Sequence, residues 1–297
     1  MPPATTRPNT VTLSNLAAPA KLNLFLHVIG RREDGRHLLQ SLFVLIDLAD
    51  TIDISLRLDG NIERTGDIIG DVEKDLCVRA ARALQTATNT SKGANIHVTK
   101  NIPSGAGMGG GSSDAATTLI ALNRLWNLNL TRDNLMQIGL TLGADVPFFI
   151  FGQSAFAQGI GEKLAPIEVP NSYWTILMPN EPTSTAEIFA ADDLTRNSKS
   201  LKISVFSAQL RSEWPNLVGH NDLQPVASRL NPQINRALKA LGSGARMTGS
   251  GSAVFAWADS ADSANHAARN CPQDMQAYVA QTLAKHPLYT WVPNAVK

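Results

Sequence analysis

The sequence is poor in cysteine and in net charge, and it has no long apolar run. Its two cysteines, Cys77 and Cys271, form no CxxC pair, so neither a disulfide framework nor a zinc site is expected. A formal net charge of +1 gives no global field for nucleic acid or an anionic membrane. No apolar run approaches the ~18 residues of a membrane span, and residues 1–15 lack the apolar core of a signal peptide. We therefore expect a soluble, cytoplasmic protein that binds any anion by a local device.

The order of the predicted elements favours the α+β fold class. Alternation predicts strands over Lys21–Ile29 and Thr51–Leu58, and helical spacing predicts a helix over Asp75–Ala87. A second capped helix is expected over Thr131–Gly143, and "SYWTILMP" is typical of a buried strand. Residues 181–217 show weaker periodicity and are expected to form a mobile or variable region. Strands and helices do not alternate regularly, which disfavours a doubly wound α/β sheet.

A dense run of glycine, "PSGAGMGGGSSDAA" from Pro103 to Ala116, is the strongest local signal. Gly105, Gly107 and Gly110 satisfy the G-x-G-x-x-G pattern of dinucleotide-binding folds. That pattern also requires an acidic residue about 20 positions on, after a second strand. Asp133 lies near that distance but begins a helix. A Walker loop is excluded because the run contains no lysine.

The run leads directly into a predicted helix. We expect Ser112 and Ser113 to cap this helix and Asp114 to lie in its first turn. Backbone N–H groups, the helix N-terminus and the two hydroxyls could together hold phosphate oxygens. The alternative is a tight strand-to-helix turn that binds no ligand.

Two further features carry polar side chains in apolar surroundings. Lys21 and Asn23 are two apart in a predicted strand and so face the same side; alone, they would be a solvent-facing pair. Asp145 stands between Gly143 and a hydrophobic run, where an unpaired carboxylate is costly to bury. The alternative for Asp145 is a cap at the start of a strand.

Taken together, these motifs resemble the GHMP kinase superfamily, which includes galactokinase, homoserine kinase and mevalonate kinase. The glycine run matches its phosphate-binding motif, and "ARMTGSGSAVFAW" matches its C-terminal glycine motif. The resemblance implies two domains, residues 1–165 and 166–297, with the active site in the cleft between them. "APAKLNLFLHVIGRREDGRHLLQSLF" and "LTLGADVPFFIFGQSAFAQGIGEKL" are similar to the branch that acts on 4-diphosphocytidyl-2-C-methyl-D-erythritol.

The resemblance implies a Mg2+-dependent transfer of the ATP γ-phosphoryl group to a hydroxyl of that substrate. The product would be the 2-phosphate, an intermediate of non-mevalonate isoprenoid biosynthesis. Asp145 would act as the general base, Lys21 would favour its ionised form, and Ser113 with the ATP phosphates would hold the metal ion. A monomer or weak homodimer is expected.

The resemblance also assigns binding residues. Those for ATP are Pro103, Gly105, Gly107, Gly109, Gly110, Gly111, Ser112, Ser113, Thr248, Gly249, Ser250 and Gly251. Those for the cytidyl substrate are Asn23, Arg36, His37, Gly159, Ile160, Thr185 and Phe189.

Two positions depart from the family pattern. Arg36 stands where the family commonly has tyrosine, and could stack on cytosine in its place. Asp75 stands where relatives often carry asparagine, near the expected adenine site, and an ionised carboxylate donates no hydrogen bond.

Three alternatives remain at this point. The chain could be another GHMP kinase, such as a homoserine kinase, with a different acceptor. It could be an NAD(P)-dependent oxidoreductase that uses Gly105, Gly107 and Gly110. It could also be a non-catalytic nucleotide-binding module in which Asp145 is structural.

Overall fold

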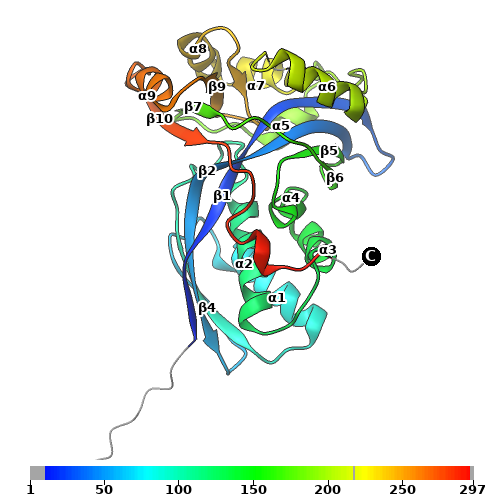
Figure 1. Cartoon of the computed structure of the whole chain (residues 1–297), viewed down its shortest axis with the longest axis vertical. Coiled ribbons are helices and arrows are strands. Elements are labelled where there is room, and N and C mark those ends of the chain that lie inside the picture. The colour runs from blue at the N-terminus through cyan, green and yellow to red at the C-terminus, as the bar shows by residue number, and fades with distance from the viewer. Residues whose placement is uncertain (1–10, 217, 295–297) are drawn as a thin grey trace, which may run out of the picture.

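The computed structural model describes residues 11–216 and 218–294, which form two sheets with helices packed on them (Figure 1). Two long antiparallel strands, β1 (Thr12–Arg31) and β2 (His37–Arg57), dominate the first sheet. The strands predicted at 21–29 and 51–58 are parts of these longer ones. Every residue of β1 from Ala18 to Val28 is buried, because both faces of the strand are covered. Buried strands lose the polar alternation that would reveal their full length.

The remaining strands of the first sheet are short, and the sheet is mostly antiparallel. The strand order is β3-β4-β2-β5-β6, with β1 on β2. Among the strands of this sheet within the described residues, only β3 and β4 pair in parallel. The bounds are β3 (Ile62–Gly66), β4 (Gly93–Thr99), β5 (Ala155–Gly159) and β6 (Lys163–Pro166). A dinucleotide-binding fold needs a mostly parallel sheet, so this topology contradicts the oxidoreductase alternative.

Four helices lie beside the first sheet in Figure 1, and their side chains share one apolar core with it. They are α1 (Leu76–Thr88), α2 (Gly110–Leu125), α3 (Arg132–Leu142) and α4 (Val146–Phe151); a short 3-10 turn, η1 (Val72–Lys74), precedes α1. The helices predicted at 75–87 and 131–143 are confirmed. Asp75 caps α1, and Thr131 with Asn134 forms a capping box on α3.

The second sheet, in the strand order β10-β7-β9-β8, forms the upper part of the molecule in Figure 1. Its strands are β7 (Tyr173–Pro179), β8 (Arg246–Met247), β9 (Val254–Ala258) and β10 (Met275–Gln281). Its helices are α5 (Thr185–Ala190), α6 (Ile203–Glu213), α7 (Gln224–Leu230), α8 (Pro232–Leu241) and α9 (Ala261–Arg269). The strand predicted in "SYWTILMP" is confirmed as β7. Residues 181–217, for which weak periodicity predicted a variable region, contain the two helices α5 and α6.

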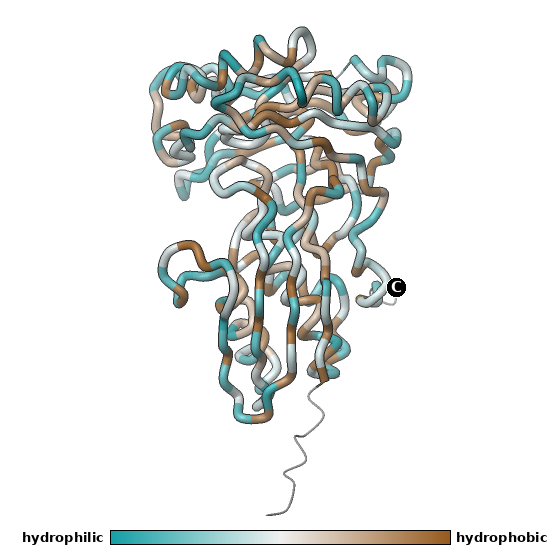
Figure 2. The backbone as a smooth tube through the Cα atoms, turned by 90° about the vertical axis from the view of Figure 1, so that its left-hand side faces the viewer, coloured by the Kyte–Doolittle hydropathy of each residue, from teal (hydrophilic) through white to brown (hydrophobic). Residues whose placement is uncertain are grey.

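The two parts of the molecule share chain segments. The long strands continue from the lower body into the broader upper one (Figure 2), where Leu26 and Val28 of β1 join the core of the second sheet. The segment after β10 returns to the first sheet. It contains the 3-10 turn η2 (Tyr289–Trp291), and the flanking residues Leu288 and Val292 pack into the core of that sheet. The α+β class is confirmed, whereas the domain division at residue 165 stays a prediction.

Candidate active site

The glycine run forms a loop, Pro103–Gly109, that leads into α2. Gly109 adopts a left-handed conformation (φ 73°) at the N-cap, and the helix begins at Gly110. The expectation that Ser112 and Ser113 cap the helix is wrong, because both already lie inside it and no side chain caps it. Ser113 is buried, and its hydroxyl donates to the Pro19 carbonyl at 2.7 Å. Ser112 is the hydroxyl of this pair that lines a cavity.

The loop needs glycine because it touches a second glycine loop, Thr248–Ser252. A side chain at Gly107 (φ 73°) would collide with the Thr248 carbonyl, and one at Gly249 would come within 2.7 Å of the Gly107 carbonyl. The two backbones also bond directly: Ser252 N–H donates to the Gly105 carbonyl at 3.0 Å. Part of the glycine signal therefore reflects loop-to-loop packing, in addition to any approach to a ligand.

The first glycine loop is also the wall between two cavities. A glycine-loop cavity of about 410 Å³ lies on the α1 side, and a central cavity of about 440 Å³ lies on the Lys21 side. Four residues line both cavities: Gly105, Gly107, Gly109 and Ser112. Pro103, Gly110 and Gly111 line the glycine-loop cavity. Groups bound on the two sides would therefore meet at the loop and at the first turn of α2.

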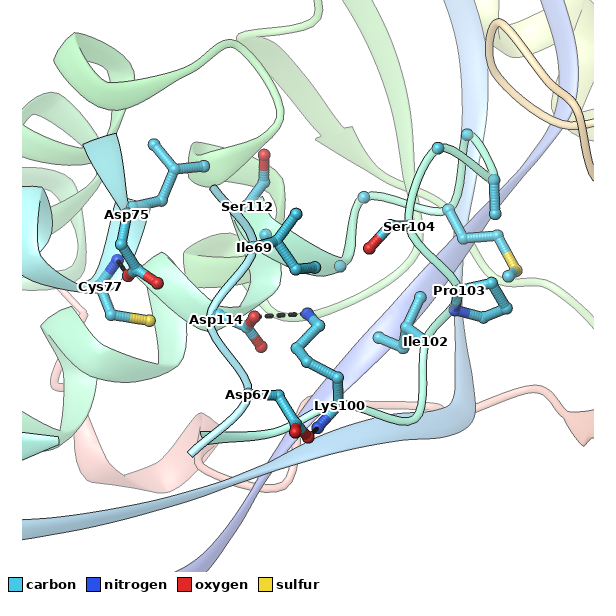
Figure 3. Close-up of a pocket in the computed structure, with 18 of the residues that line it drawn as sticks. Asp67, Ile69, Asp75, Cys77, Lys100, Ile102, Pro103, Ser104, Ser112 and Asp114 are labelled. Carbon is cyan, nitrogen blue, oxygen red and sulfur yellow. Dashed lines mark hydrogen bonds and ion pairs between the residues drawn. The ribbon is translucent and has the colours of Figure 1, made fainter. Parts of the chain in front are cut away.

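A half-buried cation, Lys100, lines the glycine-loop cavity. Lys100 Nζ donates to Asp114 at 2.6 Å (Figure 3). It also donates to Asp50 of β2. Burial, with repulsion from Asp50, raises the pKa of Asp114 to about 7, although Lys100 opposes this. One Asp114 oxygen, Oδ1, is buried without a hydrogen-bond partner among the described residues. The expectation that Asp114 is a first-turn residue is corrected: it lies in the second turn of α2 and belongs to this ion-pair network.

The Asp75 carboxylate, the second departure from the family pattern, has a structural task in this cavity. It caps α1 by accepting from the N–H groups of Cys77 and Val78, and Arg64 Nε donates to it at 3.1 Å. Figure 3 shows Asp75 on the far side of the cavity from Pro103. An ionised carboxylate is well suited to a helix N-terminus, so the aspartate here serves the start of the helix.

The central cavity holds the predicted Lys21 and Asp145 pair. Lys21 Nζ lies 3.6 Å from Asp145 Oδ2 and also donates to Asn23 Oδ1. Asn23 is fixed in turn, because its amide donates to Ser41 Oγ at 2.9 Å. Burial lowers the pKa of Lys21 from its usual 10.5, and the neighbouring Asp145 opposes this shift. Sequence spacing predicted that Lys21 and Asn23 share a face, and they do so in the interior.

Asp145 differs from Lys21 in its access to solvent. It occupies the N-cap position of α4, a helix and not the expected strand, yet its side chain makes no capping hydrogen bond. About 34% of that side chain is exposed, against 5% for Lys21. A carboxylate that does not cap its helix and faces a cavity can accept a proton from a bound ligand.

The second glycine loop closes one side of the central cavity. Gly249, Ser250 and Gly251 line it. Thr248 is buried instead, and its hydroxyl accepts from the Asn23 N–H at 2.9 Å. Thr248 therefore joins this loop to the strand that carries Lys21.

The residues expected at the cytidine end are only partly brought together. Thr185 and Phe189, both on α5, line the central cavity. His37 lies outside the lining but stacks on Phe189, with ring centroids 4.8 Å apart. Arg36 is exposed in the turn between β1 and β2, outside both cavity linings.

The loop after β5 contributes less backbone than expected. Ile160 and Gly161 line the central cavity, whereas Gly159 does not. The Ile160 N–H already donates to the Glu162 carboxylate at 2.6 Å. That N–H is therefore not free to donate to a ligand.

Sequence reasoning missed several side chains around these cavities. Lys100 comes three residues before Pro103, so its nearness to the glycine run was a usable signal. Asp50 and Ser41 come from β2, and no local pattern connects them to the motifs. The same holds for Arg196, which contacts His37.

Comparison with known proteins identifies the class. The family model described as "GHMP kinases N terminal domain" matches residues 75–153, and "GHMP kinases C terminal" matches residues 202–277. The chain belongs to the GHMP kinase family, whose members are ATP-dependent small-molecule kinases.

Several relatives whose sequences align with most of this chain share one name. The 4-diphosphocytidyl-2-C-methyl-D-erythritol kinase of Thiobacillus denitrificans is 53% identical over 93% of this chain and 98% of its own. The protein of the same name from Aromatoleum aromaticum is 49% identical over 96% of this chain and 99% of its own. A crystal structure of 4-(cytidine 5'-diphospho)-2C-methyl-D-erythritol kinase is 32% identical with a TM-score of 0.78, covering 92% of this chain and 99% of that one.

Homoserine kinase from Cytophaga hutchinsonii is a more distant structural relative. It is 18% identical with a TM-score of 0.69, covering 96% of this chain and 98% of that one. At this identity the likeness shows a shared fold and says nothing of a shared acceptor. Within residues 11–216 and 218–294, no helix is both long and apolar enough to cross a membrane.

Proposed function

We propose that this protein transfers the γ-phosphoryl group of ATP to a hydroxyl of 4-diphosphocytidyl-2-C-methyl-D-erythritol, giving the 2-phosphate for non-mevalonate isoprenoid biosynthesis. The observation that carries the proposal is the Lys21 and Asp145 pair, 3.6 Å apart in a cavity walled by the glycine loop. The identity of about 50% to enzymes of that name supports the choice of acceptor.

Asp145 is the proposed general base. Its partly exposed carboxylate would accept the proton of the acceptor hydroxyl as the oxygen attacks the γ-phosphorus in line. Lys21 is buried beside it, and its positive charge would favour ionised Asp145 and the developing negative charge on the attacking oxygen. Asn23 and Ser41 would keep the Lys21 ammonium in place through their hydrogen bonds.

The glycine-loop cavity is the proposed ATP site. Glycine N–H groups and the N-terminus of α2 offer donors and a favourable dipole for phosphate oxygens. Mg2+ is held in such sites mostly by phosphates and waters, with one or two protein oxygens. Ser112 lines both cavities, so its hydroxyl is a better candidate for the protein ligand of Mg2+ than that of the predicted Ser113, which is buried and already hydrogen-bonded. The metal ion would neutralise charge on the transferred group.

Phe189 and His37 are the proposed contacts for the cytosine. Phe189 lines the central cavity, where its ring can stack on a base. His37 stacks on that ring and could offer a ring N–H to a base acceptor. Thr185 lies on the same helix one turn earlier and lines the same wall.

ADP release with Mg-ATP and a panel of acceptor alcohols tests the proposal. We expect turnover with the cytidyl substrate and little with homoserine or mevalonate. Phosphorylation of homoserine or mevalonate without the cytidyl substrate would place the chain in another branch of the family. ATP binding without turnover of any acceptor would favour a non-catalytic module.

A further inference from the structure

Arg196, in the segment between α5 and α6, contacts the side chain of His37 and the backbone of Phe189, the two residues proposed to recognise the base. Its Nε donates to His37 Nε2 at 3.2 Å. Its Nη2 donates to the carbonyls of Phe189 at 3.1 Å and Ala191 at 2.7 Å. Its Nη1 donates to the Leu194 carbonyl at 3.2 Å. One guanidinium therefore joins the start of β2 to the C-terminal end of α5.

The contact with His37 fixes the state of the imidazole. A guanidinium has donors and no acceptor, and it does not lose its proton in proteins. His37 Nε2 must therefore accept, which requires a neutral ring with its proton on Nδ1. Burial, with the charges of Arg196 and of Arg31 on β1, lowers the pKa of His37 and supports that neutral state. The ring then offers one N–H donor, at Nδ1.

The contacts with α5 hold the backbone at Phe189, the second residue proposed to recognise the base. The last carbonyls of a helix lack partners within the helix, and Arg196 satisfies those of Phe189 and Ala191 in a fork geometry that lysine does not provide. The hydrogen bond to the Phe189 carbonyl holds the backbone from which the ring projects. His37 and Phe189 then stack at 4.8 Å with an interplanar angle of 26°.

We propose that Arg196 is a positioning residue for nucleobase recognition, which holds His37 as an Nδ1–H donor and Phe189 as a stacking surface. The inference rests on the proposed function for the identity of the base. A single donor beside an aromatic face suits a pyrimidine that presents a carbonyl oxygen or an unprotonated ring nitrogen. Arg196 touches no reacting atom, so it would affect substrate affinity more than the chemical step.

The kinetic test compares Arg196→Met and Arg196→Lys with wild type. We expect the KM for the cytidyl substrate to rise roughly tenfold or more in Arg196→Met, as the loss of charge-assisted hydrogen bonds implies. We expect kcat and the KM for ATP to change less than about twofold, and Arg196→Lys to be intermediate because it keeps the charge without the fork. The control is Arg236→Met, which removes an exposed arginine paired with Asp274 and should leave all three constants unchanged.

A spectroscopic arm does not depend on substrate identity. Nitrogen-15 NMR of the histidine side chains, with His37 assigned from its loss in His37→Gln, reports which ring nitrogen carries the proton. We expect Nδ1–H in wild type and a shift toward Nε2–H in Arg196→Met.

An unchanged tautomer in Arg196→Met, or an unchanged cytidyl KM in both Arg196 variants, would overturn the positioning role. If wild type does not phosphorylate the cytidyl substrate, the proposed function fails, and the tautomer measurement still decides whether Arg196 sets the state of His37. If Arg196→Met does not fold, Arg196→Gln, whose uncharged amide can accept as well as donate, carries the tautomer test, and Arg196→Lys carries the kinetic test.

Discussion

The two cavities on either side of the glycine loop are built in different ways. The wall of the glycine-loop cavity toward the loop is mostly backbone, and one of its glycines, Gly107, is required by close contact with a second glycine loop. The central cavity depends on side chains far apart in the sequence, with Lys21 from β1 facing Asp145 at the start of α4. A site built from backbone tolerates changes in nearby side chains but not changes in backbone conformation. A site built from side chains is instead sensitive to the chemistry of those side chains. Substitutions should therefore separate the two cavities.

The largest expected effect is on the side-chain site. Asp145→Asn removes the proposed base while keeping its size, so we expect turnover to fall by about 1,000-fold, within the range typical of general bases. The Kd for ATP should stay within about twofold of wild type, because Asp145 lines only the central cavity. Steady-state kinetics and calorimetric ATP titration measure the two quantities.

Asp133→Asn is the matched control for this substitution. Asp133 is an exposed residue in the first turn of α3, so its variant should behave as wild type. Unchanged turnover in Asp145→Asn would end the general-base assignment. A large loss of ATP affinity would contradict the separation of the two cavities.

The next effect is on the backbone site. Gly107→Ala would place a Cβ against the Thr248 carbonyl at a φ of 73°, so we expect a loss of about 1–3 kcal/mol in the free energy of unfolding and weaker ATP binding. Urea denaturation and ATP titration measure both.

Gly244→Ala separates backbone strain from contact. Gly244 also has a positive φ, 93°, but nothing lies within 4 Å of an added Cβ. It should show the strain cost alone, about 1–2 kcal/mol, with normal ATP binding. Equal effects of the two substitutions would contradict the argument that loop-to-loop contact selects glycine.

The pH dependence of turnover tests the charge of Lys21. Because burial lowers its pKa below 10.5, the ammonium should lose its proton as the pH rises through that lowered value. We expect kcat to decline on the alkaline side with a midpoint below 10.5, by about tenfold per pH unit beyond it. The charge of the side chain in Lys21→Arg persists to higher pH. This variant should turn over more slowly than wild type, but its turnover should not show the alkaline decline. If kcat of Lys21→Arg declines with the same alkaline midpoint as that of wild type, the decline is caused by another titrating group.

The smallest expected effect concerns the ion-pair network in the glycine-loop cavity. The pKa of Asp114 is raised from 3.8 to about 7, so the folded state binds the proton more tightly than the unfolded state. That contribution to stability is present at low pH and is lost as the pH rises through about 7. Asp114→Asn lacks it at every pH.

Urea denaturation measures this difference. Between about pH 5.5 and about pH 8.5, we expect wild type to lose about 1–2 kcal/mol relative to Asp114→Asn. A pH-independent difference between the two proteins would contradict the raised pKa. Asp133→Asn again serves as the control.

Sequence reasoning succeeded where the signal was local. Asp75 and Thr131 were correctly placed at the starts of their helices, because capping is decided within a few residues. The start of α2 was predicted too late, because serine is a common cap and glycine in the left-handed conformation was not considered. Both serines were predicted to bind ATP; Ser112 lines the cavities, whereas Ser113, which was also predicted to hold the metal ion, is buried and bonded to the Pro19 carbonyl.

Tertiary packing decided the rest. The full length of β1 was hidden because both of its faces are buried. Lys100 and Asp114 are paired across a strand end and a helix, and Arg196 reaches His37 from a segment that showed no clear periodicity. The predicted roles of Lys21, Asp145 and the cytidine-side residues stay predictions until they are tested by substitution.

Phosphorus NMR of the reaction product tests the central claim most directly. Wild-type protein is incubated with Mg-ATP and 4-diphosphocytidyl-2-C-methyl-D-erythritol, and the products are followed over time. We expect a new phosphomonoester resonance, coupled to the methylerythritol unit and assigned to its 2-hydroxyl, to grow with ADP while the diphosphate bridge stays intact. ADP formed with inorganic phosphate alone, or a phosphoryl group on any other position, would contradict the account.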